Sequence, residues 1–380
     1  MFLLHFVYLV NFVVKNLRCK EFFVPHPILD RPGRLLKLDP SDMIRKVLDF
    51  PAQCQDARSQ VLAHPPKLKV SGIRQVILAG LGGSAIGGDI LKSLTWKNAG
   101  FSLTVNRHYT LPGWAGKDTL VVCSSYSGGT EETLSVFKQA VAKKLKVLVM
   151  TSGGELMKLA HKAKTPVLAL PGGLPPRAAL GYSFFTLLTA LESLKLLPSY
   201  TGAFDETLEI LTRQASQYGP LSETARNPAK LLALFLHEKL PLFYAGQDHL
   251  DSAGLRWKTQ MNENAKQIAL FNVIPEMNHN EILGYSFPEA LTKKMAVVLL
   301  RQPQGDHPQI ARRFDLLKGM ITSKAAGVTE IEAKGKSLLA QIFSVIYLGD
   351  FSSVYLAYLK GVDPTPIGLI DQFKSRLSQR

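Results

Sequence analysis

The sequence predicts an α/β protein built from two three-layer domains, each with a parallel sheet flanked by helices. From about Ile73 onward, short apolar runs alternate with segments of helical periodicity. Such alternation is typical of parallel strands joined by helices, because parallel strands need a long crossover connection and are buried on both faces. The alternation is interrupted by a linker region that begins near Pro198, and it resumes near Pro241. A chain of 380 residues is long enough for two domains.

The expected strands are short, mostly apolar runs bounded by turn residues. The first set consists of Gln75–Ala79, Ser102–Val105, Thr119–Cys123, Val147–Met150 and Pro166–Leu170. The second set consists of Pro241–Ala245, Leu270–Ile274, Ala296–Leu300 and Val328–Glu332. The main helices expected outside these strand sets are Phe184–Leu197, Glu206–Tyr218 and Leu338–Leu359.

One more helix is expected before the first sheet, capped by Ser41 or Asp42 and running to Phe50. Pro51 is expected to end it, because proline disrupts a helix interior. The chain therefore divides into an apolar extension at 1–28, an N-terminal helical segment at 29–72, a first sheet domain at 73–203, a linking helix at 204–226 and a second sheet domain with C-terminal helices at 227–380.

The segment Met1–Val14 is almost wholly apolar and is followed by Lys15, Arg18 and Lys20. It lacks a basic region before the apolar core and a small-residue cleavage site, and it is short for a membrane span of about 20 residues. A signal peptide and an anchor remain alternatives. We expect instead that the extension is no part of the functional fold, that the protein has no membrane partner and that it is cytoplasmic.

The charge balance favours small anions over nucleic acid. The chain carries 45 Lys and Arg against 30 Asp and Glu, a formal net charge of +15. The positive residues are scattered, however, and no basic run, zinc-finger spacing or RNA-binding signature is present. Three cysteines, Cys19, Cys54 and Cys123, have no paired spacing, which favours a reducing compartment.

The segment Val121–Thr133 reads VVCSSYSGGTEET, which is typical of a strand leading into a phosphate-binding loop and a helix. The helix N-terminus offers unpaired N–H groups, and Ser125, Ser127 and Thr130 offer hydroxyls. Thr130 is also expected to cap the helix. No lysine follows the second glycine, so the segment is not a nucleotide P-loop, and a monophosphate fits better. The alternative is a turn rich in Ser and Gly for conformational reasons alone.

The turn after the first expected strand, Gly80–Asp89, reads GLGGSAIGGD. It is not the dinucleotide fingerprint G-x-G-x-x-G, because Ala85 takes the third glycine's place and no acidic residue closes the next strand to hold a ribose. We therefore expect no nicotinamide cofactor. Ser84 is expected to cap the following helix while its hydroxyl faces a ligand.

Six motifs follow one another along the chain: GLGGSAIGGD, SYSGGTEET, PPRAALGY, NENAK, PEMNHNE and GVDPTP. With them the sequence resembles the bifunctional phosphoglucose/phosphomannose isomerases, which consist of two sugar-isomerase (SIS) domains. The resemblance extends from about Leu29 to the C-terminus. It implies a five-stranded parallel sheet in each domain, a homodimer with active sites between subunits, and isomerisation of aldose and ketose 6-phosphates without a metal or other cofactor.

The activity implied by this resemblance is interconversion of glucose 6-phosphate and fructose 6-phosphate, with mannose 6-phosphate as a further substrate. One departure from the family pattern is Gly129, where asparagine is usual. The loop hydroxyls are intact, so the departure concerns the fine shape of the loop.

The resemblance assigns three catalytic residues. Isomerisation moves a proton between adjacent carbons and needs one base that reaches both, and Glu263 in NENAK takes this role. His279 in PEMNHNE is assigned to opening the pyranose ring from the neighbouring subunit. Arg177 follows two prolines that restrict its position, and its permanent cation suits an enediolate oxygen. Without the resemblance, Glu263 is explained as a solvated helix carboxylate, His279 as a loop histidine and Arg177 as a surface arginine.

The expected substrate contacts come from three parts of the chain. Thr365 matches, by its Thr-Pro context, the family threonine linked to handling both C2 epimers. Lys374 lies where the family has a substrate-contacting lysine, although a terminal amphipathic helix explains it equally well. The residues expected around the phosphate are Gly82, Gly83, Ser84, Ser125, Ser127 and Thr130.

Two other functions remain as alternatives. A non-enzymatic SIS-domain sugar-phosphate sensor needs the phosphate loop but no base, so the joint presence of Glu263, His279 and Arg177 favours an enzyme. The isomerase domain of an aminosugar synthase ordinarily follows a glutaminase domain whose catalytic cysteine comes directly after the initiator methionine. This sequence has Phe2 at that place.

Overall fold

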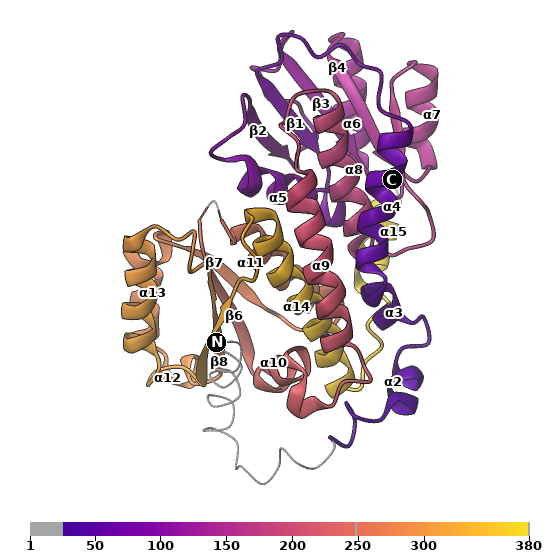
Figure 1. The fold of residues 1–380 in the computed structure, drawn as a ribbon. Helices are drawn as coiled ribbons and strands as arrows, with labels where there is room; N and C mark the ends of the chain where they lie inside the picture. The colour runs from indigo at the N-terminus through magenta and orange to yellow at the C-terminus, as the bar shows by residue number, and fades with distance from the viewer. Residues whose placement is uncertain (1–25, 248, 379–380) are drawn as a thin grey trace.

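The computed structural model describes residues 26–247 and 249–378, which form two parallel sheets, one above the other in Figure 1. The predicted extension Met1–Val14 lies outside the described residues. The first sheet has the strand order β2-β1-β3-β4-β5 and the second has the order β7-β6-β8-β9. Every strand pairs in parallel with its neighbours. The α/β class and the two helix-flanked parallel sheets are therefore as predicted.

Side chains of the first sheet alternate between two helical layers, as the twofold periodicity of strands requires. Ile77, Val121 and Val149 pack with the helices α6 and α7. Their strand neighbours Leu78 and Val122 pack with α5 and α8 on the other face. The strands are β1 (Gln75–Ala79), β2 (Ser102–Asn106), β3 (Thr119–Ser124), β4 (Lys146–Thr151) and β5 (Val167–Ala169). The helices are α5 (Ile86–Thr95), α6 (Glu131–Ala142), α7 (Gly154–Lys162) and α8 (Leu180–Ser193).

The second sheet is layered in the same way. Leu242 and Val297 pack with α13, whereas Phe243 and Val298 face the layer formed by α10, α11 and α14. The strands are β6 (Leu240–Gly246), β7 (Leu270–Ile274), β8 (Met295–Arg301) and β9 (Gly327–Glu332). The helices are α10 (Pro228–Leu236), α11 (Asp251–Glu263), α13 (Pro308–Ile321) and α14 (Leu338–Leu359).

The helix α14 lies at the centre of the molecule. Among the described residues it is the one helix long and apolar enough to cross a membrane, and 94% of its most apolar window is buried inside the fold. A Cβ atom on Gly349 would lie 2.2 Å from the indole nitrogen of Trp257, so glycine at this position lets α11 pack closely against α14. The helix is thus part of the protein core.

One hydrophobic cluster includes residues of both sheets and of the helices between them, α4 (Phe50–Ala63), α9 (Thr201–Tyr218) and α14. The division of the chain at 203 and 226 stays a prediction. The remaining elements are short: α2 (Pro32–Leu38), α3 (Met43–Leu48), η1 (Gly82–Ser84), η2 (Pro176–Ala178), η3 (Thr224–Arg226), η4 (Glu276–His279), η5 (Glu281–Ser286) and α12 (Glu289–Thr292).

Three expectations about the fold are corrected. Every expected strand is present, but among the described residues the second sheet has four strands where five were implied, and the chain passes from β9 directly into α14. Pro51 does not end the N-terminal helix: α3 ends at Leu48, and Pro51 stands in the first turn of α4, where its missing N–H costs nothing. The helix α8 begins and ends four residues earlier than expected, spanning Leu180–Ser193.

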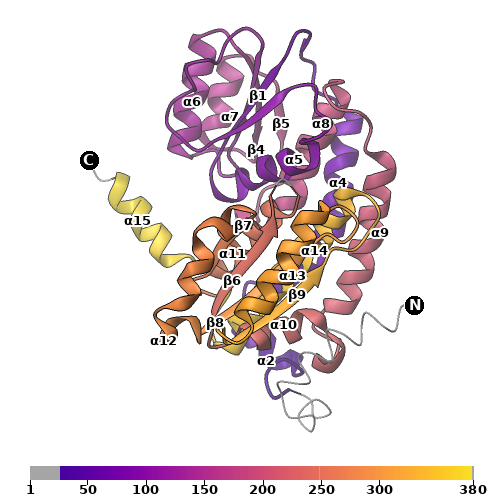
Figure 2. The same cartoon turned by 90° about the vertical axis from the view of Figure 1, so that its left-hand side faces the viewer.

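The last described helix, α15 (Gly368–Ser378), extends away from the rest of the chain in Figure 2. Its apolar side chains Leu369 and Phe373 are 84% and 68% exposed. The helix therefore makes no contribution to the core of a single chain.

Candidate active site

The two glycine-containing turns meet at one end of the first sheet. The turn after β1 and the loop after β3 leave adjacent strands at their carboxyl ends, and β2 lies on the far side of β1. In an open parallel sheet, ligands bind outside the carboxyl ends of the strands at the point where the strand order reverses. Since β1 and β3 flank that point, both turns border one candidate crevice.

The loop after β3 is held in a tight turn against the loop after β4. Gly128 has a φ of +70°, and a Cβ atom on it would lie 1.9 Å from the carbonyl oxygen of Gly153. Ser125 is buried, and its Oγ lies 2.8 Å from the Oγ1 of Thr130, whereas Ser127 is exposed. The capping role expected of Thr130 is wrong: it occupies the N-cap position of α6, but its hydroxyl pairs with Ser125 and makes no cap.

Ser84 joins the first turn to this loop. Its Oγ accepts a hydrogen bond of 3.0 Å from the backbone N–H of Tyr126. The expectation that Ser84 caps α5 is wrong, because Ala85 occupies the N-cap position and Ser84 belongs to η1. The hydroxyl therefore fixes one turn against the other.

Arg177 lies on η2, which packs closely against the first turn. A Cβ atom on Gly83 would lie 2.7 Å from the carbonyl oxygen of Pro176. The lack of a side chain at Gly83 thus allows this approach. The Arg177 side chain is 3% exposed, so its guanidinium is held well inside the molecule.

The guanidinium of Arg177 is fully engaged with the second half of the chain. Its Nε donates to the Oδ1 of Asn264 at 2.6 Å. Its Nη2 donates to the carbonyl oxygens of Pro364 and Thr365, each at 2.8 Å. Burial lowers the pKa of Arg177, and the nearby Glu263 carboxylate opposes that shift. Because the ordinary pKa of arginine is so high, the group remains a fixed cation.

A cavity of about 190 Å³ separates the first turn from α11. Glu263 is the last residue of α11, and its Oε2 lies 3.5 Å from the Nη1 of Arg177. The Glu263 side chain is 26% exposed, which leaves it accessible from the cavity. The lining residues are Gly82, Gly83, Ile86, Arg107, Arg177, Leu255, Arg256, Thr259, Gln260 and Glu263.

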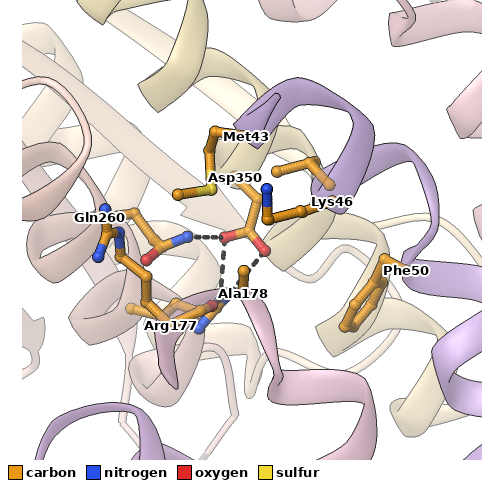
Figure 3. Close-up of a pocket in the computed structure, with 9 residues that line it drawn as sticks. Met43, Lys46, Phe50, Arg177, Ala178, Gln260 and Asp350 are labelled. Atoms are coloured by element: carbon orange, nitrogen blue, oxygen red, sulfur yellow. Dashed lines mark hydrogen bonds and ion pairs between the residues drawn. The ribbon is translucent and has the colours of Figure 1, made fainter. Parts of the chain in front are cut away.

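A buried ion pair supports Arg177. In Figure 3 the carboxylate of Asp350, on α14, lies close to Gln260 and to the backbone that carries Arg177 and Ala178. The Nε and Nη2 of Arg256 donate to the two oxygens of Asp350 at 2.9 and 2.7 Å, and the Nε2 of Gln260 donates to one of them at 3.1 Å. The Nη2 of Arg256 also donates to the backbone carbonyl of Arg177 at 3.0 Å, which fixes η2.

Lys266 holds the loop that carries Thr365. Its Nζ donates to the carbonyl oxygens of Glu263 and Pro364, each at 2.9 Å. Burial lowers the pKa of Lys266 to about 8, and the charge of Arg177 acts in the same direction. The Oγ1 of Thr365 is buried without a hydrogen-bond partner among the described residues. Such a hydroxyl is expected to bond a ligand or water.

The structure brings only part of the predicted site into this cavity. Gly82, Gly83, Arg177 and Glu263 line it. The other predicted phosphate contacts do not line the cavity; they are Ser84, Ser125, Ser127 and Thr130. Thr365, on a neighbouring loop, does not line it either. His279, at the end of η4, and Lys374, on α15, are exposed and do not line the cavity within one chain. Their roles stay predictions.

Four polar side chains of the cavity were not predicted from the sequence: Arg107, Arg256, Thr259 and Gln260. Three of them, Arg256, Thr259 and Gln260, recur with the predicted Glu263 at intervals of one to four residues, which places all four on one face of a helix. A polar helix face that also carries a predicted catalytic residue would have indicated the other three. Arg107 gave a weaker signal, its position directly after a strand.

Solved structures of other proteins have the same fold. A glucose-6-phosphate isomerase like protein from Thermus thermophilus matches with a TM-score of 0.60 and 20% identity, over 92% of this chain and 99% of that chain. A putative phosphosugar isomerase from Clostridium difficile 630 matches with a TM-score of 0.64 and 15% identity, over 88% and 98%. The protein therefore has the double α/β fold seen in these proteins.

Proteins related in sequence identify the family, which the solved structures do not. A family profile described as Bacterial phospho-glucose isomerase C-terminal SIS domain matches residues 225–377. The bifunctional phosphoglucose/phosphomannose isomerase of Caldicellulosiruptor bescii is 40% identical over 89% of this chain and 99% of its own length. The D-glucosamine-6-phosphate 4-epimerase of Sulfolobus acidocaldarius is 34% identical over 81% of this chain and 90% of its own length. The chain belongs to the bifunctional phosphoglucose/phosphomannose isomerase family, as its six motifs predicted.

Proposed function

We propose that this protein interconverts glucose 6-phosphate and fructose 6-phosphate and also accepts mannose 6-phosphate. The observation that carries the proposal is the pair formed by Glu263 and Arg177, 3.5 Å apart in one cavity. A carboxylate base beside a permanent cation is what proton transfer through an enediol requires. Membership of the family supports the same assignment.

The reaction follows from these two groups. In the open-chain aldose, Glu263 takes the proton from C2, the electron pair forms a C1–C2 double bond, and O1 gains a proton to give an enediol. Return of the proton to C1, with loss of the proton on O2, gives the ketose. Return of the proton to the opposite face of C2, with loss of the proton on O1, gives the epimeric aldose. Arg177 stabilises the negative charge that develops on the oxygens.

The remaining roles complete the proposal. The hydroxyls of the two turns, on Ser84, Ser125, Ser127 and Thr130, are assigned to the phosphate because both turns border the reversal point of the first sheet. His279 opens the pyranose ring from the partner subunit of a homodimer. Thr365, whose hydroxyl is buried without a partner among the described residues, and Lys374 are further substrate contacts. We place the enzyme in the cytoplasm, without a membrane partner.

Two other activities are distinguishable from this one. A sugar-phosphate sensor would bind the substrates without converting them. The similarity to the 4-epimerase of Sulfolobus acidocaldarius makes epimerisation of glucosamine 6-phosphate at C4 a second candidate.

The experiment is a coupled assay with glucose 6-phosphate, mannose 6-phosphate and glucosamine 6-phosphate as separate substrates. The proposal expects fructose 6-phosphate from the first two and no change in the third. Binding without turnover would support a sensor, and conversion of glucosamine 6-phosphate alone would support the 4-epimerase.

A further inference from the structure

The phosphate loops of this protein contain no positive side chain. Gly80–Leu91 and Val121–Thr133 contain neither lysine nor arginine. Glu131 and Glu132 begin α6 directly after the second loop and bring negative charge close to it. A phosphate dianion held there by hydroxyls and N–H groups alone would have no side-chain counterion, so a cation from another element would strengthen its binding.

Three guanidinium groups line the neighbouring cavity, and two of them are already committed. Arg177 uses Nε, Nη1 and Nη2 for protein partners. Arg256 is 3% exposed and uses Nε and Nη2 to bind Asp350 and the backbone. Neither can turn toward an anion without breaking buried hydrogen bonds. Both arginines therefore act on a substrate phosphate through the electrostatic field of their charges and not through direct hydrogen bonds.

Arg107 is different. It follows the last residue of β2, its side chain is 40% exposed, and Asp89 is the one carboxylate that pairs with it among the described residues. That contact uses a single guanidinium nitrogen, Nη2. No hydrogen bond to its other guanidinium nitrogens is present among the described residues, and Arg107 lines the cavity together with Gly82 and Gly83.

The loop that carries Arg107 is fixed beside the phosphate loop. The carbonyl oxygen of Tyr109 accepts hydrogen bonds from Ser135 and Gln139 of α6, each at 2.7 Å. The hydroxyl of Tyr109 donates to Glu131, in the first turn of α6, at 3.3 Å. Arg107 thus lies on a loop that is attached to α6 on one side and lines the sugar cavity on the other.

We propose that Arg107 is the cation that binds the phosphate group of the substrate, with Asp89 holding the guanidinium in place. The inference rests on the proposed function, because it takes the cavity as the sugar-phosphate site. Arginine suits the role because its planar fork binds two phosphate oxygens at once.

The test compares Arg107→Gln with a matched control, Arg74→Gln. Arg74 is also exposed, but it directly precedes β1 and so lies at the amino end of that strand, opposite the end that leads into the first turn. Binding of inorganic phosphate is measured by calorimetry, and kcat and KM are measured with glucose 6-phosphate. In Arg107→Gln the phosphate Kd and the KM are each expected to rise at least about tenfold, with kcat within about threefold of the wild type. Both constants should change less than about twofold in the control.

Circular dichroism and thermal melts establish that both variants are folded. An unchanged phosphate Kd in Arg107→Gln overturns the proposal, and if the KM still rises, the guanidinium binds sugar hydroxyls. A wild-type protein that does not bind inorganic phosphate also overturns it. If the wild type binds phosphate but does not convert hexose 6-phosphates, the proposed function fails, while the calorimetric comparison still decides the role of Arg107.

Discussion

The Nη1 of Arg177 lies 3.5 Å from the Oε2 of Glu263, although 86 residues separate them in the sequence. Arg177 follows the last strand of the first sheet, and Glu263 ends the helix α11 that packs on the second sheet. Each half of the chain therefore supplies one member of the proposed catalytic pair. The site depends on how the helices between the two sheets pack.

Removing the basicity of Glu263 should abolish most of the activity. Glu263→Gln keeps the shape and hydrogen-bonding capacity of the side chain, so we expect kcat to fall at least about 100-fold and KM to stay within about threefold. Glu289→Gln, at an exposed position of α12, is the control and should retain full activity. A kcat for Glu263→Gln within about tenfold of the wild type would place the base elsewhere.

The activity should decrease at alkaline pH with an apparent pKa near 8, the value to which burial lowers Lys266. Above this pH the amine loses its charge and holds the carbonyl oxygen of Pro364 less strongly. Lys266→Arg keeps its charge throughout and should move the decrease at least about one pH unit higher. Steady-state kcat/KM profiles of both proteins measure this shift, and identical profiles would refute the role of Lys266.

Unfolding driven by Lys266 cannot cause that loss of activity. The pKa of Lys266 in the folded chain, about 8, lies below its ordinary value of 10.5. Between these pH values the folded chain has released the proton that the unfolded chain still binds. The contribution of Lys266 to the free energy of unfolding therefore increases with pH across this window. Thermal melts at each pH separate this contribution from the kinetic effect.

Loss of the buried carboxylate at Asp350 should destabilise the fold. Asp350→Asn leaves the guanidinium of Arg256, which is 3% exposed, without its counterion. We expect the free energy of unfolding to fall by about 3 kcal/mol. Asp315→Asn breaks a pair with Arg301 in which Asp315 is 69% exposed, and should cost less than about 1 kcal/mol. Urea denaturation measures the free energy of unfolding of both variants. Equal decreases would show that the buried pair stabilises the fold no more than the exposed pair does.

The sequence predicted the fold more completely than the site. The strands are predictable because successive residues such as Ile77 and Leu78 face different helical layers, and burial on both faces gives near-continuous apolar runs. The sequence does not predict the helix α4, because a proline such as Pro51 commonly ends a helix, whereas proline is also compatible with a first turn. The pair of Arg256 with Asp350 joins positions 94 residues apart, and no local pattern indicates such a contact.

The site is expected to be shared between subunits. His279 is exposed and does not line the cavity of its own chain, so we expect it to act in the site of the partner subunit. Mixing Glu263→Gln chains with His279→Ala chains should then restore activity, because one of the two composite sites in each heterodimer contains both intact groups. The activity of purified heterodimers measures this. Heterodimers as inactive as the parent variants would place both residues in one subunit's site.

The most direct measurement of the central claim is proton NMR of the wild-type protein with glucose 6-phosphate in deuterated water. Proton transfer by Glu263 through an enediol predicts the appearance of fructose 6-phosphate and mannose 6-phosphate, with solvent deuterium entering at C2 of the aldoses. Glucose 6-phosphate that keeps its C2 proton and gives no ketose, under conditions in which the protein binds it, would contradict the account.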